Sequence, residues 1–418
     1  MNDTNAWDVV VVGAGAAGLV AASRAAELGR RVLLVEKNPR PGVKILMSGG
    51  TRCNITQATD NRGVIAAFGR QGRFLHSALA SLGVDETLAL FAAEGLRTKV
   101  EPTGKIFPES DRAADVLTAL VRRLDRHGAA MALAEPLRDI ARDGAGFRLT
   151  TDKRLLLARK VILTTGGQSY PGSGTTGDGY AWATAFGHTV VPPRPALTPL
   201  VVADAWPREL RGVTIPDAAL RVLDPLAPRP RDKILAERRG SLLFAHFGLS
   251  GPVALDVSRV VARHDRPASL ALECDFLPAT KPAELETALR ERSAGAGKRL
   301  AAATLPDALP RRLVEALLAL AGVRPDRKAA ELTRDERTRL ARQCKSTMLA
   351  LSGTLGFKKA EVTSGGVALD EIDSRDMQSK LAPGLFIAGE LLDLDGPIGG
   401  YNFQAAWSTG WLAGTSAV

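Results

Sequence analysis

The hydrophobic pattern at the start of the chain predicts two strands with a helix between them. Residues 7–12 (WDVVVV) and 31–36 (RVLLVE) are apolar runs of the length of a buried strand. Residues 16–28 are rich in Ala and Leu, and Gly29 ends this helical stretch. Two buried strands joined by a helix pair in parallel, so the sequence predicts a βαβ unit.

The same pattern divides the rest of the chain. Four prolines within residues 191–200 (VPPRPALTPL) indicate a crossing between domains. Ser110 is the expected N-cap of one helix. We expect a long loop over 37–56, helices over 74–96, 111–126, 281–343 and 401–414, and short strands over 131–137, 147–151, 160–164, 196–275 and 361–388.

Composition limits the class of protein. A chain of 418 residues exceeds one average core, which predicts two or three domains. Its three cysteines are odd in number and lack metal-ligand spacing, so we expect a reducing compartment, no disulfide framework and no bound metal. The apolar run 9–22 follows an acidic flank, which excludes a secretory signal. No apolar stretch reaches membrane-spanning length, so we expect a cytoplasmic protein without membrane insertion.

The net charge of +10 is concentrated in one segment. Residues 281–345 hold 15 Lys and Arg against 9 Asp and Glu. A solvated helical surface in an Arg-rich protein is the favoured interpretation. Attraction of acidic substrates or nucleic acid is the alternative.

A glycine-rich turn supplies the first chemical motif. Gly13-x-Gly15-x-x-Gly18 joins the first strand to the first helix, and Glu36 ends the next strand. Gly13 permits the tight turn, Gly15 lets backbone approach a pyrophosphate, and Gly18 lets the helix pack closely. The pyrophosphate meets free N–H groups at the positive end of the helix dipole, including those of Ala16 and Ala17. Glu36 accepts hydrogen bonds from the ribose hydroxyls, so the motif predicts dinucleotide binding.

The other end of the chain favours FAD over NAD. Residues 384–402 (GLFIAGELLDLDGPIGGYN) form a strand, a Gly-Glu pair and a Gly-Gly turn into a helix. This order is similar to the second FAD signature of the glutathione-reductase-type flavoproteins. The resemblance implies that the acidic residue binds the ribityl or phosphate region and that the helix N-terminus faces the flavin pyrimidine. The positions concerned are Gly389, Glu390, Gly399, Gly400, Tyr401, Asn402 and Phe403.

Four sequence blocks together resemble the BaiN-like family of bacterial NAD(P)/FAD-dependent flavoproteins. They are GAGAAGLVAA with residues 35–56, TGKIFPESDRAADVL (103–117), residues 164–188 and the run from VTSGGV to residue 414. Residues 242–258 fit the middle region of the family. Val43 stands where the family commonly has Arg or Lys, and Thr51 replaces the third glycine of a usual three-glycine run.

The resemblance implies an α/β fold with a glutathione-reductase-type FAD-binding Rossmann domain assembled from both ends of the chain. We expect its first part in residues 1–190 and its second in 359–418. A β-rich domain, 191–280 with 344–358, and a helical subdomain, 281–343, would be inserted between them.

Further cofactor contacts are expected from three segments. In the loop 42–54, Lys44 and Arg52 neutralise phosphate, while Ser48, Gly49 and Gly50 offer N–H groups. Cys53 and Asn54 are candidates for flavin contact, with simple packing favoured over a redox role for the thiol. Asp178 is expected to be a helix N-cap rather than a catalytic acid. The remaining candidates are Lys37 beside Glu36, and Leu137, Thr165 and Gly166 near the adenine.

The sequence therefore predicts an FAD-dependent oxidoreductase. No second Gly-x-Gly-x-x-Gly follows a strand, so NAD(P)H is expected to act as a transient reductant at the flavin itself. The expected substrate is an unidentified small molecule, and His246 is the best substrate-side candidate among scattered histidines. A flavoprotein linked to RNA modification is the alternative, although aromatic residues are sparse in the basic segment. A non-catalytic FAD-binding protein is a third.

Overall fold

The computed structural model describes residues 6–229, 232–295 and 299–418. They form two compact units, one comprising Met1–Pro195 with Glu361–Val418 and the other Ala196–Ala360. The first unit is thus built from both ends of the chain, and the second from one continuous stretch.

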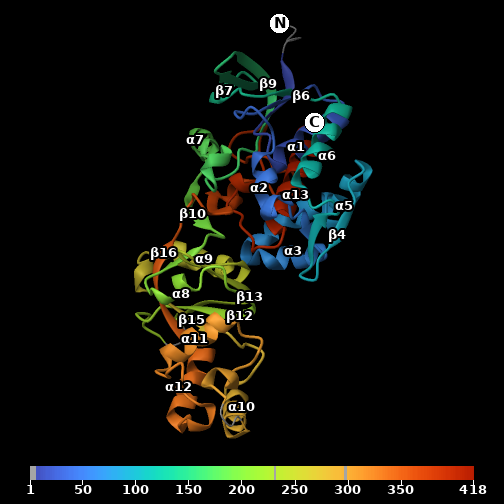
Figure 1. Cartoon of the computed structure of the whole chain (residues 1–418). Helices are drawn as coiled ribbons and strands as arrows, with labels where there is room; N and C mark the ends of the chain where they lie inside the picture. The colour runs from blue at the N-terminus through green and yellow to red at the C-terminus, as the bar shows by residue number, and fades with distance from the viewer. Residues whose placement is uncertain (1–5, 230–231, 296–298) are drawn as a thin grey trace. The chain divides into compact units, whose positions relative to one another are not determined.

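The first unit is built on a seven-stranded sheet with a parallel centre (Figure 1). β1 (Trp7–Val12) lies between β2 (Val32–Val35) and β9 (Leu155–Leu163) and is parallel to both. β6 (Ala130–Ala132) pairs with β2, and β18 (Leu385–Ile387) pairs with the end of β9, again in parallel. The predicted βαβ unit and the Rossmann-type α/β class are confirmed.

An antiparallel extension shares β9 with the parallel strands. β8 (Gly146–Thr151) pairs with the first part of β9, and β7 (Leu137–Asp143) pairs with β8. All four residues of β2 and the last four of β1 are buried, as expected for strands covered on both faces.

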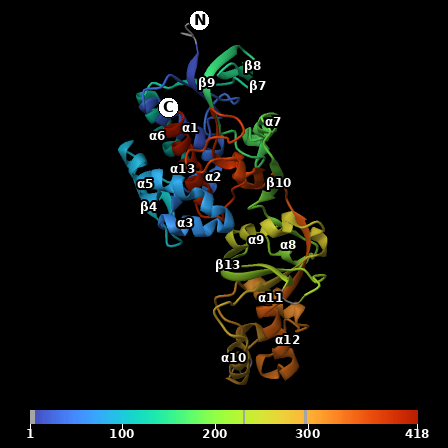
Figure 2. The same cartoon turned by 180° about the vertical axis from the view of Figure 1, so that it is seen from behind.

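Two helices from opposite ends of the chain lie side by side in this unit. α1 (Ala16–Glu27) and α13 (Tyr401–Ser416) are adjacent in both Figure 1 and Figure 2. A Cβ added at Gly410 would stand 2.4 Å from the Ala17 carbonyl oxygen, and one at Gly414 would stand 2.4 Å from that of Ala21. Glycine therefore allows the two backbones to approach closely.

Smaller elements complete the first unit. Its other helices are α2 (Val43–Thr51), α3 (Asn61–Ala67), α4 (His76–Ser81), α5 (Val84–Ala93), α6 (Ala113–Arg126) and α7 (Asp178–Ala185). Two further small sheets comprise β3 (Thr56–Gln57), β5 (Lys105–Pro108) and β4 (Thr98–Val100), and β10 (Val190–Ala196) with β17 (Val362–Val367).

The second unit is a closed six-stranded barrel with helices. Around the barrel the order is β11 (Leu200–Val202), β14 (Gly248–Ser250), β13 (Ile234–Ala245), β12 (Thr214–Leu223), β15 (Ala271–Asp275) and β16 (Thr347–Thr354). The helices are α8 (Trp206–Glu209), α9 (Pro252–Arg263), α10 (Pro282–Gly295), α11 (Arg311–Leu320) and α12 (Arg334–Lys345). Barrel residues such as Phe244 share one hydrophobic core with helix residues such as Leu317.

Three expectations about elements were wrong. The loop expected over 37–56 contains α2, whose apolar turn is obscured in the sequence by its Ser-Gly-Gly end. The helix expected over 74–96 is broken before Gly83, whose N–H donates to Glu86 and starts α5. The strands expected over 196–275 include α9, because Pro252 at its first turn starts a helix that its valines disguise.

The expected cap of α6 was also wrong. α6 begins at Ala113 with Arg112 at the N-cap position, so Ser110 lies outside the helix. Within the described ranges, no helix is both long and apolar enough to cross a bilayer.

Candidate active site

The three glycines of the first motif have the contacts that dinucleotide binding requires. Gly13 has φ of +100°, and a Cβ there would stand 2.8 Å from the Thr164 carbonyl oxygen. A Cβ at Gly18 would stand 1.9 Å from the Gly13 carbonyl oxygen, so α1 packs tightly on the turn. A Cβ at Gly15 would meet no described atom within 4 Å. Only the middle glycine thus faces open space, where a pyrophosphate would pass.

The N-terminus of α1 has the features of an anion-binding site. Gly15 is the N-cap, and no side chain of the described chain caps the helix. The N–H groups of Ala16, Ala17 and Gly18 therefore have no partner within the helix, and the helix dipole adds positive potential there.

Glu36 is fixed beside this turn. Its carboxylate accepts hydrogen bonds from the backbone N–H of Ala14, at 2.7 Å, and of Asn38, at 2.8 Å, and the residue is only 8% exposed. The orientation of the carboxylate is thus set by the backbone. This places an acceptor next to the anion-binding turn, as ribose recognition requires.

Lys37 is held by an acidic partner. Its Nζ lies 2.5 Å from an Asp178 carboxylate oxygen. Burial raises the pKa of Asp178, but hydrogen bonds from Lys37 and Thr176, together with the charges of Lys37 and Arg138, lower that pKa overall. Asp178 is the first residue of α7, with Gly177 at the N-cap position, so the expected N-cap role was wrong by one residue.

The segments expected near the adenine converge on the same edge. Leu137 begins β7, and the nearby Glu135 N–H donates to the Glu36 carbonyl oxygen at 2.9 Å. Thr165 and Gly166 follow β9 directly after Thr164, which contacts the Gly13 turn. These residues therefore approach the first motif from the ends of two further strands.

Lys44 connects the N-terminal loop to the C-terminal motif. Its Nζ lies 2.5 Å from a Glu390 carboxylate oxygen and 2.6 Å from the Ser169 hydroxyl. Glu390 also accepts hydrogen bonds from the Ser169 hydroxyl and from the Thr363 N–H, each at 2.7 Å. Ser169 and Thr363 were absent from the sequence prediction, because nothing local marks them.

The loop that follows Lys44 has an unusual backbone. Ser48 is extended within α2, and Gly49, Gly50, Thr51 and Cys53 all have positive φ, between 54° and 70°. Side chains disfavour this conformation, which costs on the order of 1–3 kcal/mol at each non-glycine residue. Such strain is typical of functional loops.

Arg52 and Cys53 follow in this loop, and their surroundings indicate structural roles. The Arg52 guanidinium pairs with Glu101 at 2.6 Å and with Asp111 at 3.4 Å, so its charge is already balanced by carboxylates. Burial raises the pKa of the Cys53 thiol to about 12. The thiol is therefore protonated at neutral pH, which supports packing over redox chemistry.

The C-terminal motif presents a second helix start. Gly400 is the N-cap of α13 with φ of 92°, and none of the described side chains caps the helix. A Cβ at Gly400 would stand 2.6 Å from the Thr56 carbonyl carbon. The amide of Asn402 holds the N–H and carbonyl oxygen of Gly396 at 2.8 and 3.0 Å. The first turn of α13, at Tyr401 and Phe403, therefore begins next to the Gly399 turn at a helix N-terminus that no described side chain caps.

Contacts also join this motif to the first one. Gly389 has φ of 72°, and a Cβ there would stand 2.8 Å from the Ala17 Cβ. The two motifs, far apart in sequence, are thus packed against one another at the start of α1.

Several buried polar atoms of the first unit have no partner among the described residues. Four of the seven belong to the region of the two motifs, namely Asn54 Oδ1, Thr165 Oγ1, Tyr180 Oη and Asp393 Oδ1, and the other three are Glu94 Oε2, Arg123 Nε and His127 Nε2. Burial raises the pKa of the Tyr180 phenol most, and the negative charges of the nearby Glu390 and Asp393 carboxylates raise it further. Unsatisfied buried groups are costly, so a set of them indicates a bound polar group. Together with the uncapped helix starts and the open space at Gly15, they fit FAD.

Tyr180 and Asp393 were not among the predicted residues. Tyr180 lies in the block of residues 164–188 that contributed to the family resemblance. No local signal marked Asp393.

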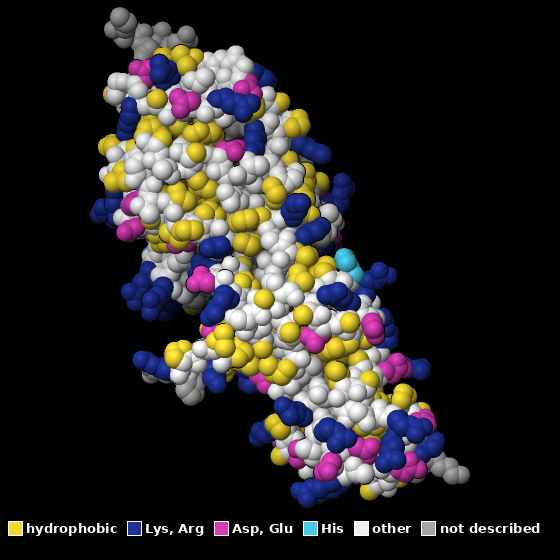
Figure 3. Space-filling model, turned by 90° about the vertical axis from the view of Figure 1, so that its left-hand side faces the viewer, with side chains coloured by type: hydrophobic (Ala, Val, Ile, Leu, Met, Phe, Trp, Pro, Cys, Tyr) yellow, Lys and Arg dark blue, Asp and Glu magenta, His cyan; other side chains and the backbone are white. Residues whose placement is uncertain are grey.

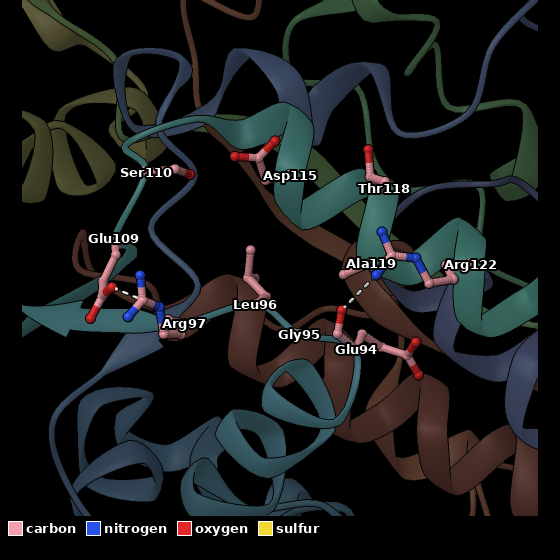
Figure 4. Close-up of a pocket in the computed structure, with 10 residues that line it drawn as sticks. All are labelled: Glu94, Gly95, Leu96, Arg97, Glu109, Ser110, Asp115, Thr118, Ala119 and Arg122. Carbon is pink, nitrogen blue, oxygen red and sulfur yellow. Dashed lines mark hydrogen bonds and ion pairs between the residues drawn. The ribbon is translucent and has the colours of Figure 1, made fainter.

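A cavity of about 280 Å³ lies elsewhere in the first unit (Figure 4). It is lined by residues of α6 and of the segments around Glu94 and Glu109. The Arg97 guanidinium pairs with Glu109 at 3.1 Å, and Arg122 donates to the Glu94 carbonyl oxygen at 2.9 Å. None of the predicted site residues lines it.

Two of the histidines, His188 and His246, lie in different surroundings. His188 is buried, with Nδ1 3.0 Å from Glu371 and Nε2 2.7 Å from the Ser379 hydroxyl. That hydroxyl also accepts the Ala382 N–H, so the cluster is a satisfied structural one. His246 is exposed in the turn between β13 and β14. No group of potential metal ligands was found among the described residues.

Known proteins match this chain along almost its whole length. A family model described as the HI0933-like protein Rossmann domain matches residues 7–416. A ribosomal RNA dihydrouridine synthase of Escherichia coli (strain K12) is 34% identical over 412 residues, covering 97% of this chain and 96% of that protein. A 3-dehydro-bile acid delta(4,6)-reductase of Clostridium scindens is 33% identical over 411 residues, covering 97% and 98% respectively.

A solved structure is similar in fold. It is the 3-ketosteroid delta1-dehydrogenase of Sterolibacterium denitrificans in complex with 1,4-androstadiene-3,17-dione. The TM-score is 0.51 at 15% identity, and the match covers 99% of both chains. At this identity the likeness concerns the fold alone.

The Rossmann-type domain and the full-length relatives define the class of the protein, a flavoprotein oxidoreductase. Within that class the chain belongs to the HI0933-like family, and the resemblance expected from its sequence blocks is confirmed.

Proposed function

We propose that this protein is an FAD-dependent reductase that saturates a C=C bond conjugated to a carbonyl group. The observation that carries the proposal is that one unit holds two uncapped helix starts, those of α1 and α13, together with Glu36 and Glu390. The start of α1 would hold the pyrophosphate, Glu36 the adenosine ribose, and the start of α13 the flavin pyrimidine.

The residues around the flavin would bind and orient it rather than react. Lys44 would exchange its Glu390 partner for a phosphate oxygen, and Asn54 and Tyr180 would offer their unpartnered atoms to the cofactor. When bound, FAD supplies hydride transfer from NAD(P)H to the β-carbon of the substrate. A proton completes the reduction at the α-carbon, so NAD(P)H and the double bond are the only redox partners needed.

The names of the two relatives support this reaction class. Dihydrouridine forms when the C5=C6 bond of uracil, conjugated to the C4 carbonyl, gains two hydrogens. A delta(4,6)-reductase acting on a 3-dehydro-bile acid also reduces double bonds conjugated to a ketone. Proteins of about one-third identity to this chain thus carry names that share one type of chemistry.

We favour a uridine of ribosomal RNA as the substrate. The 34% identity to a ribosomal RNA dihydrouridine synthase supports this choice, as does the net charge of +10, which suits a polyanionic partner. A second candidate is a steroid-like enone, which the 33% identity to the bile-acid enzyme favours. In either case we propose that the first unit carries the cofactor and that the inserted β-rich and helical parts select the substrate.

Anaerobic titration tests the reductive half of the proposal. The purified protein should carry FAD, and NADH or NADPH should bleach its visible absorbance. Addition of a uridine-rich ribosomal RNA transcript should restore the absorbance, and mass spectrometry should find uridines heavier by two hydrogens. A steroid enone that restores it while RNA does not would select the second candidate. A protein that takes up no flavin would contradict the whole proposal.

A further inference from the structure

A basic segment lies next to the C-terminal flavin motif. Residues 60–76 (DNRGVIAAFGRQGRFLH) comprise α3 and a 3₁₀ helix, Gly69–Leu75. Arg62, Arg70 and Arg73 are exposed. Throughout the described part of the chain, none of these three guanidinium groups pairs with a carboxylate. Their charge is therefore available to a partner.

The two arginines of the 3₁₀ helix share a face. Residues three apart are eclipsed in this type of helix, so Arg70 and Arg73 project on the same side. Arg62 lies one turn before Ile65 on α3, and a Cβ at Gly72 would stand 1.9 Å from the Ile65 carbonyl oxygen. The two short helices are thus packed closely, which brings the three cations onto one small structure.

Contacts tie this structure to the expected flavin end of the site. The Gln71 amide, between the two arginines, donates to the Asp393 carbonyl oxygen at 2.7 Å. Phe68 packs under Gly396, where a Cβ would stand 2.8 Å from its ring. Gly396 is in turn held by Asn402 in the first turn of α13. One loop therefore separates the arginines from the helix start that faces the flavin.

Some other arginines of the same unit are neutralised by carboxylates, whereas others, such as Arg30 and Arg148, are exposed and pair with no carboxylate among the described residues. Arg52 pairs with Glu101 and Asp111, and Arg138 pairs with Asp152. Across the face drawn in Figure 3, Lys and Arg side chains are scattered over the surface. What distinguishes the segment is the combination of unneutralised charge with a place beside the site.

We propose that Arg62, Arg70 and Arg73 form a phosphate-binding patch that holds the backbone of an RNA substrate next to the flavin. This inference rests on the proposed function and adds the surface by which RNA would be recognised. Guanidinium groups bind phosphate oxygens through paired hydrogen bonds, and each contact releases counterions from the RNA. A small neutral substrate has no use for three unpaired cations there.

The test compares two triple variants of the full-length holoenzyme. The first is R62Q/R70Q/R73Q. The matched control is R30Q/R148Q/R159Q, which removes the same charge from exposed arginines of the same unit near the starts of the parallel strands, away from the Gly13 turn. Fluorescence anisotropy with a labelled oligouridylate at several salt concentrations gives the Kd and its salt dependence. Flavin absorbance and the melting temperature verify that each variant is folded.

We expect the patch variant to raise the Kd at least about tenfold at moderate salt, and to lower the salt slope by about one for each phosphate that it no longer binds. The control should change the Kd less than about twofold. Equal weakening by both variants would attribute binding to overall charge and overturn the patch. Wild-type protein that binds and reduces RNA, with a patch variant of unchanged Kd, would overturn the patch alone. Wild-type protein that binds no RNA would overturn the patch together with the proposed RNA substrate.

Discussion

Thr51 and Cys53, just before strand β3, have a backbone conformation that side chains disfavour. Thr51 has φ of 70° and Cys53 has φ of 60°, directly after two glycines with positive φ. The turn is closed by the Cys53 N–H, which donates to the Ser48 carbonyl oxygen at 3.1 Å. The strain is therefore built into the connection between Lys44 and Asn54. It explains why the family usually has glycine where this chain has Thr51.

Replacement of this threonine by glycine tests the strain directly. Thr51→Gly should raise the free energy of unfolding by up to about 1 kcal/mol, because glycine adopts positive φ without the steric cost of a Cβ. Thr51→Ala keeps the Cβ and should leave stability nearly unchanged. Urea unfolding followed by circular dichroism measures both variants. A glycine variant less stable than the alanine variant would contradict this account.

At the level of single residues, contacts within one short segment could be predicted from the sequence, whereas contacts between distant segments could not. The Gly13 turn and Glu36 follow from spacing within one βαβ unit, and their contacts match that reasoning. Lys44 and Glu390 are 346 residues apart, and no spacing in the sequence joins them. Arg52 was expected at a phosphate, whereas its nearest charges are the carboxylates of Glu101, which follows β4, and of Asp111, in the segment before α6. Such partners depend on tertiary packing.

At the scale of elements, the contact between α1 and α13 joins the two halves of the candidate site. The helices touch through glycine, and α1 carries the first motif while α13 carries the second. The sequence predicted both helices but gave no measure of how closely they pack. It also missed α2 and α9, because glycine and valine obscure the helical pattern.

Gly410→Ala should therefore destabilise the protein by about 1–3 kcal/mol, the usual cost of overpacking. The new Cβ would stand 2.4 Å from the Ala17 backbone, which has little freedom to move. It should also weaken FAD retention, because Ala17 belongs to the predicted pyrophosphate turn. Gly295→Ala, at an open position at the end of α10, is the matched control and should be neutral or slightly stabilising. Thermal unfolding and flavin release compare them. Equal stability of both variants would contradict close packing.

At the scale of the whole molecule, the chain passes from one unit to the other twice, after Pro195 and after Ala360. Within each unit, the two segments next to these passages are neighbours. In the second unit, β11 and β16 are antiparallel neighbours, and the Leu355 N–H donates to the Pro199 carbonyl oxygen at 3.1 Å. In the first unit, β10 pairs with β17, and a Cβ at Gly365 would stand 2.6 Å from the Pro192 carbonyl oxygen. A segment whose ends are adjacent can be inserted into another domain without disturbing it.

The second unit should accordingly fold alone. It has its own hydrophobic core, and its barrel is closed, so it leaves no open sheet edge. Residues 196–360 expressed separately should unfold in one cooperative transition by calorimetry. The first unit, with residues 197–359 replaced by a short Gly/Ser linker, should retain FAD, because every residue in the two predicted motifs lies within it. If the linked first unit folds yet takes up no FAD, then cofactor binding needs the inserted unit. The proposal that the first unit carries the cofactor by itself would then be wrong.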